Sequence, residues 1–173
     1  MSRLQRDFFT RDVLEVAPDL LGEILVRKFD DSSIKKYLIT EVEAYRGHED
    51  LACHASKGRT PRTEIMFHEG GYVYVYLIYG MYWMLNFVTD LKDTPQAVLI
   101  RGIEGFDGPG KLTKNLLIDK SFYGEDLISS NRLWIENSEI PKDFKIKTTP
   151  RIGIDYAGDI YKNKLWRFII EKN

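Results

Sequence analysis

The sequence contains a single cysteine, Cys53, so no disulfide can form within the chain and nothing in the composition points to secretion. It also lacks an excess of one charge, because 25 lysine and arginine residues stand against 26 aspartate and glutamate residues. This balance excludes a strongly basic tail or an acidic disordered tail. It does not exclude a nucleic-acid partner, since such binding depends on local patches rather than on net charge. Charges occur throughout residues 1–10, so we expect no signal peptide and an intracellular location.

Long uninterrupted apolar segments are missing as well. The longest apolar run, residues 72–87, is interrupted by Gly80, and its first half alternates with a period of two. This pattern is typical of strands and not of a membrane-spanning helix, so we expect no membrane association.

The length of 173 residues and the hydrophobic fraction of 43% predict one globular domain over residues 1–173. Segments typical of strands and of helices do not alternate regularly, which favours an α+β fold with a mainly antiparallel curved sheet and flanking helices. The expected strands are Glu23–Phe29, Lys36–Tyr45, Tyr72–Tyr79, Tyr82–Thr89, Gln96–Arg101, Leu133–Glu136, Arg151–Ile154 and Leu165–Ile170. The expected helices are one capped by Thr10, one starting at Thr60-Pro61 and one over Pro109–Ile118.

Two carboxylates share one face of the strand expected at Lys36–Tyr45. Alternation places Glu41, Glu43 and Tyr45 on that face. The opposite face is formed by Leu38, Thr40, Val42 and Ala44. Paired carboxylates at the end of a strand suit an active site, although a solvated outer face would have the same pattern.

Metal ligands are scarce, because the chain has three histidines. His48, Asp50 and His54 lie close in sequence, but their spacing matches no known zinc signature. We therefore expect neither a metal nor another cofactor, and a metal-dependent hydrolase that uses these three residues is the alternative.

Basic residues gather in the segment from His54 to Arg62, which has no acidic residue. This segment could contact phosphates, or it could be an ordinary charged loop. The glycine-rich segment from Gly105 to Lys111 resembles a phosphate-binding loop but continues with Leu112 instead of serine or threonine, so nucleotide hydrolysis is not expected. A phosphate contact by Lys111 remains reasonable.

The hairpin expected around Gly80 is unusually rich in tyrosine. Tyr72, Tyr74 and Tyr76 share one face, which could stack on bases or pack into the core. Tyr79 breaks the alternation at the turn, where an aromatic side chain could act as a wedge between base pairs.

Taken together, these segments resemble the alkyladenine (3-methyladenine) DNA glycosylase family. The matching segments occur in the same order along nearly the whole chain. They include Glu41–Tyr45, Gly58–Arg62, Tyr74–Met81, Val98–Arg101, Gly108–Leu112, Pro150–Ile154 and Trp166–Phe168.

The resemblance implies a role for individual residues. Glu43 would be the general base that activates water, with Arg101 and the main-chain carbonyl of Ile152 helping to hold that water. The residues implied in binding the substrate base are Tyr45, Ala52, His54, Tyr76, Asn86 and Leu99. The residues implied in contacting DNA are Arg59, Thr60, Tyr79, Met81 and Lys111, with Tyr79 filling the space left by a flipped base.

The resemblance also implies a monofunctional glycosylase of base-excision repair that acts as a monomer. It would bind double-stranded DNA carrying damaged purines, in the cytoplasm of a prokaryote or the nucleus of a eukaryote. The family commonly has a longer insertion where this chain has only Gly102–Asp107, so DNA contacts made by that insertion would be missing here. A catalytically weak module that binds damaged DNA is the other alternative.

Overall fold

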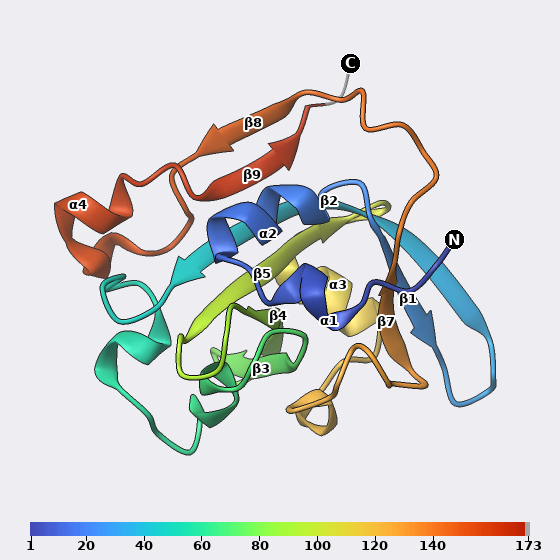
Figure 1. Cartoon of the computed structure of the whole chain (residues 1–173), viewed down its shortest axis with the longest axis horizontal. Helices are drawn as coiled ribbons and strands as arrows, with labels where there is room; N and C mark the ends of the chain where they lie inside the picture. The colour runs from blue at the N-terminus through green and yellow to red at the C-terminus, as the bar shows by residue number, and fades with distance from the viewer. Residues whose placement is uncertain (172–173) are drawn as a thin grey trace.

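The computed structural model describes residues 1–171, and its centre is an antiparallel sheet (Figure 1). The strands are β1 (Ile24–Lys28), β2 (Ile34–Arg46), β3 (Val73–Ile78), β4 (Tyr82–Thr89), β5 (Gln96–Ile103), β6 (Phe106–Asp107), β7 (Leu133–Glu136), β8 (Ile146–Thr149) and β9 (Arg167–Ile170). The α-helices are α1 (Arg6–Phe9), α2 (Val13–Leu20), α3 (Pro109–Asn115) and α4 (Gly158–Lys162). Short 3₁₀ helices are η1 (His54–Lys57), η2 (Glu64–Phe67), η3 (Lys120–Phe122) and η4 (Asp155–Ala157). The predicted α+β class with a mainly antiparallel sheet is confirmed.

The sheet order is β3-β4-β5-β2-β1-β7, and β9 joins the second half of β2. Strand β2 is long enough to pair with β1 through its first residues and with β9 through Glu41–Glu43. As a result, segments from the middle and from the end of the chain lie on either side of the same carboxylates. In Figure 1, β9 accordingly lies beside β2, with β8 on its outer side, although more than a hundred residues separate β9 from β2 in sequence.

Strand β2 carries an irregularity that simple alternation does not predict. Its register against β5 shifts between Ile39 and Val42. Ile39 and Val42 are therefore both fully buried in the main core, although strict alternation places them on opposite faces. Beyond this bulge, Val42 and Ala44 share one face, as predicted, and this face points into the core, whereas Glu43 points away from it.

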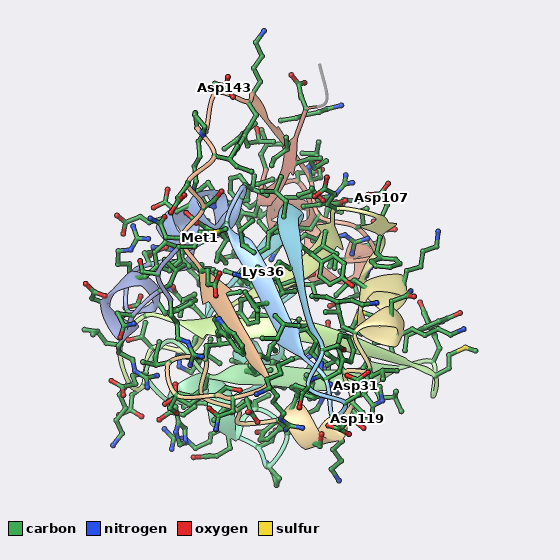
Figure 2. All side chains as sticks on the ribbon, turned by 90° about the vertical axis from the view of Figure 1, so that its right-hand side faces the viewer. Met1, Asp31, Lys36, Asp107, Asp119 and Asp143 are labelled. Carbon is green, nitrogen blue, oxygen red and sulfur yellow. The ribbon has the colours of Figure 1, made fainter. Side chains whose placement is uncertain are left out.

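The helices cover the sheet through apolar faces. Helix α2 packs against β2 and β5, and α3 packs against β4 and β5. Pro109 starts α3 at a position where its missing N–H needs no partner, in agreement with the sequence prediction. Figure 2 shows the molecule from the side of β1, β2 and β7, where Lys36 of β2 forms an ion pair with Glu136 of β7. No helix within residues 1–171 is both long and apolar enough to cross a bilayer.

Three local predictions were wrong. Residues 151–154 are not a strand, because Pro150 precedes them and the left-handed Gly153 (φ 74°) lies among them. The strand lies instead at Ile146–Thr149. The helix expected after Thr10 is capped by Asp12, whose side chain accepts the N–H of Leu14.

The third wrong prediction is the helix at Thr60-Pro61. The Thr60 hydroxyl does accept the N–H of Thr63, as a capping residue would. However, only a turn and the 3₁₀ helix η2 follow.

The hairpin of β3 and β4 turns as the sequence predicts. Ile78 pairs with Tyr82, and the N–H of Met81 bonds to the carbonyl of Ile78. Tyr79 and Gly80, the central residues of this turn, both have positive φ angles, of 50° and 65°. The turn leaves the Tyr79 side chain 87% exposed.

Candidate active site

Glu43 lies on β2 just beyond the bulge, and no part of it is exposed. Its Oε2 accepts the backbone N–H of Ile152 at 2.7 Å, and its Oε1 accepts the hydroxyl of Tyr45 at 3.0 Å. The guanidinium of Arg101, on β5, lies 3.5 Å from Oε1. A donor on β2 itself and donors from two distant parts of the chain therefore hold one buried carboxylate in place.

The environment of Glu43 favours a carboxyl group that can take up a proton. Burial raises the pKa of Glu43 above its ordinary value, although Arg101, the Ile152 N–H and the Tyr45 hydroxyl each lower it. Burial also raises the pKa of Tyr45 well above 10.0, and the nearby Glu43 charge raises it further. Tyr45 is therefore a hydrogen-bond donor at neutral pH.

The two carboxylates predicted on one strand face share one cation. Arg101 Nε lies 3.2 Å from Glu41 Oε1, and Arg167 Nε of β9 lies 2.6 Å from the same oxygen. Glu41 thus holds Arg101 at Nε, Glu43 lies at Nη1, and Arg167 neutralises Glu41. The alternating charges limit the directions in which the Arg101 guanidinium can move.

A pocket lined by aromatic side chains lies next to this carboxylate. It brings together five of the six residues predicted to bind the substrate base: Tyr45, Ala52, His54, Tyr76 and Asn86. The rings of His54 and Tyr76 meet edge to face at 4.5 Å between centroids. Burial lowers the pKa of His54 to about 4, with smaller contributions from Arg62 and Lys57, so its ring is neutral at physiological pH.

The pocket opens into a groove of about 510 Å³. The groove shares Tyr45, His54 and Tyr76 with the pocket. It is also lined by Leu99, Arg101, Ile152 and Tyr79. Since Tyr45, Arg101 and Ile152 all contact Glu43, the carboxylate lies directly beneath the surface of this groove.

The residues predicted to contact DNA are only partly brought together. Met81 is 64% exposed beside Tyr79 at the hairpin tip, and Lys111 is exposed on α3, but neither lines the pocket or the groove. Thr60 lines a neighbouring hollow with Lys57 and Arg62. Arg59 instead forms ion pairs with Glu64 and Asp93, which its position in the basic segment did not reveal.

The methylpurine-DNA glycosylase family matches this chain over residues 7–107 and 106–173. The chain belongs to the methylpurine-DNA glycosylase family. It is therefore a DNA glycosylase, a hydrolase of N-glycosyl bonds, and the resemblance seen in the sequence is confirmed.

Individual relatives are similar over almost their whole length. A protein of Borreliella afzelii (strain PKo), named "Putative 3-methyladenine DNA glycosylase", is 47% identical over 98% of this chain and 97% of its own. Proteins of the same name from Legionella pneumophila (strain Corby) and Clostridium novyi (strain NT) are 46% and 44% identical. They cover 100% and 99% of this chain, and 97% and 96% of their own lengths.

The three residues of the metal-site alternative have other partners in this glycosylase. Both carboxylate oxygens of Asp50 bind Arg151, at 2.6 Å and 2.9 Å, and both side chains are fully buried. The His54 ring bonds to the Tyr74 hydroxyl, and the His48 ring packs on Phe67. Within residues 1–171, no group of three histidine, cysteine, aspartate or glutamate side chains is arranged to hold a metal ion.

Two features of the site were missed by sequence reasoning. The first is the ion pair between Asp50 and Arg151, which are 101 residues apart in sequence. Arg151 also donates to the Ala44 carbonyl and lies over the Tyr45 ring, so this pair anchors the segment that supplies the Ile152 N–H. The second is Tyr156, a further pocket-lining residue, which lies just after the segment 151–154 that was predicted to be a strand.

The buried pair generates a prediction for stability. Asp50→Ala leaves the Arg151 charge buried without its partner, and we expect it to lower the free energy of unfolding by about 3–5 kcal/mol. Glu49→Ala is the matched control, because Glu49 forms only an exposed pair with Arg46 and should cost at most about 1 kcal/mol. Urea unfolding measures both, and equal stability of the two variants would contradict the anchoring role of Asp50.

Proposed function

We propose that this chain is a monofunctional DNA glycosylase of base-excision repair, which hydrolyses the N-glycosidic bond of alkylated or deaminated purines flipped out of duplex DNA. The observation that carries the proposal is the fully buried Glu43 carboxylate, held beneath a groove that joins an aromatic pocket. The product is an abasic site. The names of the relatives favour 3-methyladenine as a substrate, and the family resemblance favours 7-methylguanine, hypoxanthine and ethenoadenine in addition.

Glu43 is suited to act as the general base. The N-glycosidic bond breaks through a sugar that resembles an oxocarbenium ion, and a carboxylate both stabilises this positive charge and accepts a proton from the attacking water. The Ile152 N–H and the Tyr45 hydroxyl fix the carboxylate, and Arg101 and the carbonyl of Ile152 would orient the water. Within residues 1–171, the one ion pair of Glu43 is with Arg101, which cannot form a Schiff base, and this supports hydrolysis without a lyase step.

The pocket is suited to an electron-poor purine. Tyr45 and Tyr76 offer aromatic faces that attract a cationic methylated base. A purine that already carries positive charge leaves without prior protonation, so for the cationic alkylated substrates a second catalytic carboxyl group is less necessary. His54 is neutral and adds no opposing charge.

The exposed hairpin tip is suited to hold the opened duplex. Flipping a nucleotide costs a few kcal/mol, and least for a damaged base pair. Tyr79 is exposed at the end of a two-stranded hairpin, where it would fill the gap left by the flipped base. Thr60, Lys111 and Met81 would contact the DNA beside it, with a single copy of the chain bound to each lesion.

The role of Glu43 is tested by Glu43→Gln. The amide cannot accept the proton of water, so we expect release of 7-methylguanine from a duplex under single-turnover conditions to fall at least about 100-fold. Lesion binding, followed by fluorescence anisotropy, should stay close to that of the unchanged protein. Release at the original rate would contradict the assignment of Glu43 as the base.

The role of Tyr79 is tested by Tyr79→Ser. The side chain is exposed, so we expect the free energy of unfolding to change by no more than about 0.5 kcal/mol. Release from duplex DNA should weaken, whereas release from single-stranded DNA, which has no gap to fill, should not. A large loss of stability combined with unchanged duplex activity would instead mark Tyr79 as a structural residue.

The role of Asn86 is tested by Asn86→Ser. The Asn86 amide is buried in the pocket wall and donates to the carbonyls of Tyr74 and Met84, so its position is fixed. A fixed amide would crowd the 2-amino group of undamaged guanine, at a cost of about 1–3 kcal/mol. We expect the serine variant to release guanine faster relative to hypoxanthine, as measured from matched oligonucleotides. An unchanged ratio would place this selectivity elsewhere.

A further inference from the structure

Tyr156 occupies a rigid position at the edge of the base pocket. It is the central residue of η4, and the residues around it, Ile154 and Ala157, are buried against Ala52 in a small apolar cluster. The Tyr156 side chain itself is 69% exposed. The backbone of this turn is therefore anchored, while its aromatic side chain remains accessible at the mouth of the pocket.

The hydroxyl of Tyr156 is held across the rim of the pocket. It donates to the carbonyl of Ala52 at 3.2 Å. Partial burial raises the pKa of Tyr156, so the phenol remains protonated and able to donate at neutral pH. An exposed tyrosine by itself is common on protein surfaces. Here the backbone of Tyr156 is anchored and its hydroxyl is hydrogen-bonded, so its ring has a defined orientation beside the pocket.

The ring of Tyr156 completes the aromatic surroundings of the pocket. It lines the pocket together with Tyr45 and Tyr76, and it also lines the groove above Glu43 and the hollow beside Lys57 and Arg62. Three rings from β2, β3 and η4 thus meet around one space. Burial also raises the pKa of Tyr76, and the neighbouring phenols Tyr74 and Tyr156 raise it further, so the pocket contains no phenolate.

We propose that Tyr156 is a specificity-determining residue, the third aromatic wall of the base pocket, which favours cationic alkylated purines over neutral purines. The hydrogen bond to Ala52 holds this wall in place. The inference rests on the proposed function, since it concerns the base that the same pocket takes. Its physical basis is that a cation is attracted to the faces of aromatic rings, whereas a neutral purine gains only stacking.

The test compares Tyr156→Leu, which keeps apolar bulk without an aromatic face, with Tyr156→Phe, which keeps the ring without the hydroxyl. The probes are duplexes that carry 7-methylguanine, which is cationic, or hypoxanthine, which is neutral. The readout is the enzyme concentration that gives half-maximal release under single-turnover conditions, determined separately from the maximal rate. Ile160→Ala is the matched control, because Ile160 lies four residues away, is 71% exposed and lines neither the pocket nor the groove.

For Tyr156→Leu, we expect the half-saturating concentration to rise about 10-fold for 7-methylguanine and about 2-fold or less for hypoxanthine. Tyr156→Phe should raise both by about 3-fold, because only the Ala52 anchor is lost, and the control should change neither. An equal change for the two lesions in Tyr156→Leu, or no change, would overturn the role of Tyr156. Failure of the unchanged protein to release either base would overturn the proposed function itself, and this inference with it.

Discussion

Burial of the Glu43 carboxylate imposes the strongest constraint on this fold. An ionised carboxylate removed from water is stable only where donors replace its hydration. Here one donor is the backbone N–H of Ile152, which comes from 109 residues further along the chain. The C-terminal part of the chain must therefore fold back against β2, and several elements of the fold hold it there.

Several features of the fold follow from that requirement. Strand β9 pairs with β2 at Glu41–Glu43, which brings Arg167 to Glu41 and thereby steadies Arg101. The Asp50–Arg151 pair fixes the segment directly before Ile152. A buried ion pair is weak evidence for overall stability, but losing one partner is costly, so this pair makes the position of the Ile152 N–H difficult to change.

The sequence was informative wherever the signal was local. Alternation predicted the strands around Glu43 and Tyr76, and the break in alternation at Tyr79 predicted an exposed tip. It could not predict the bulge between Ile39 and Val42, because a shift in register depends on the partner strand.

Local sequence patterns also could not predict contacts between residues that are distant in sequence. Asp50 was a metal ligand only in the alternative hypothesis, and its partner Arg151 is distant in sequence. Arg59 was predicted to contact DNA, but it forms ion pairs with Asp93 and Glu64. The family resemblance supplied residues that no local pattern indicated, such as Ala52 and Asn86, which do lie in one pocket. Tyr156 was missed because its segment was predicted to follow a strand, and only the fold brings it to the pocket.

The central claim is that a buried Glu43 with a raised pKa acts as the base, and the pH dependence of base release tests it most directly. The base must be deprotonated to act, so the single-turnover release of 7-methylguanine should rise with pH and then level off. Because burial raises the pKa of Glu43, the midpoint of that rise should lie above the ordinary glutamate value of 4.5. A rate that stays constant between about pH 4 and about pH 8, or that falls as the pH rises, would contradict the account.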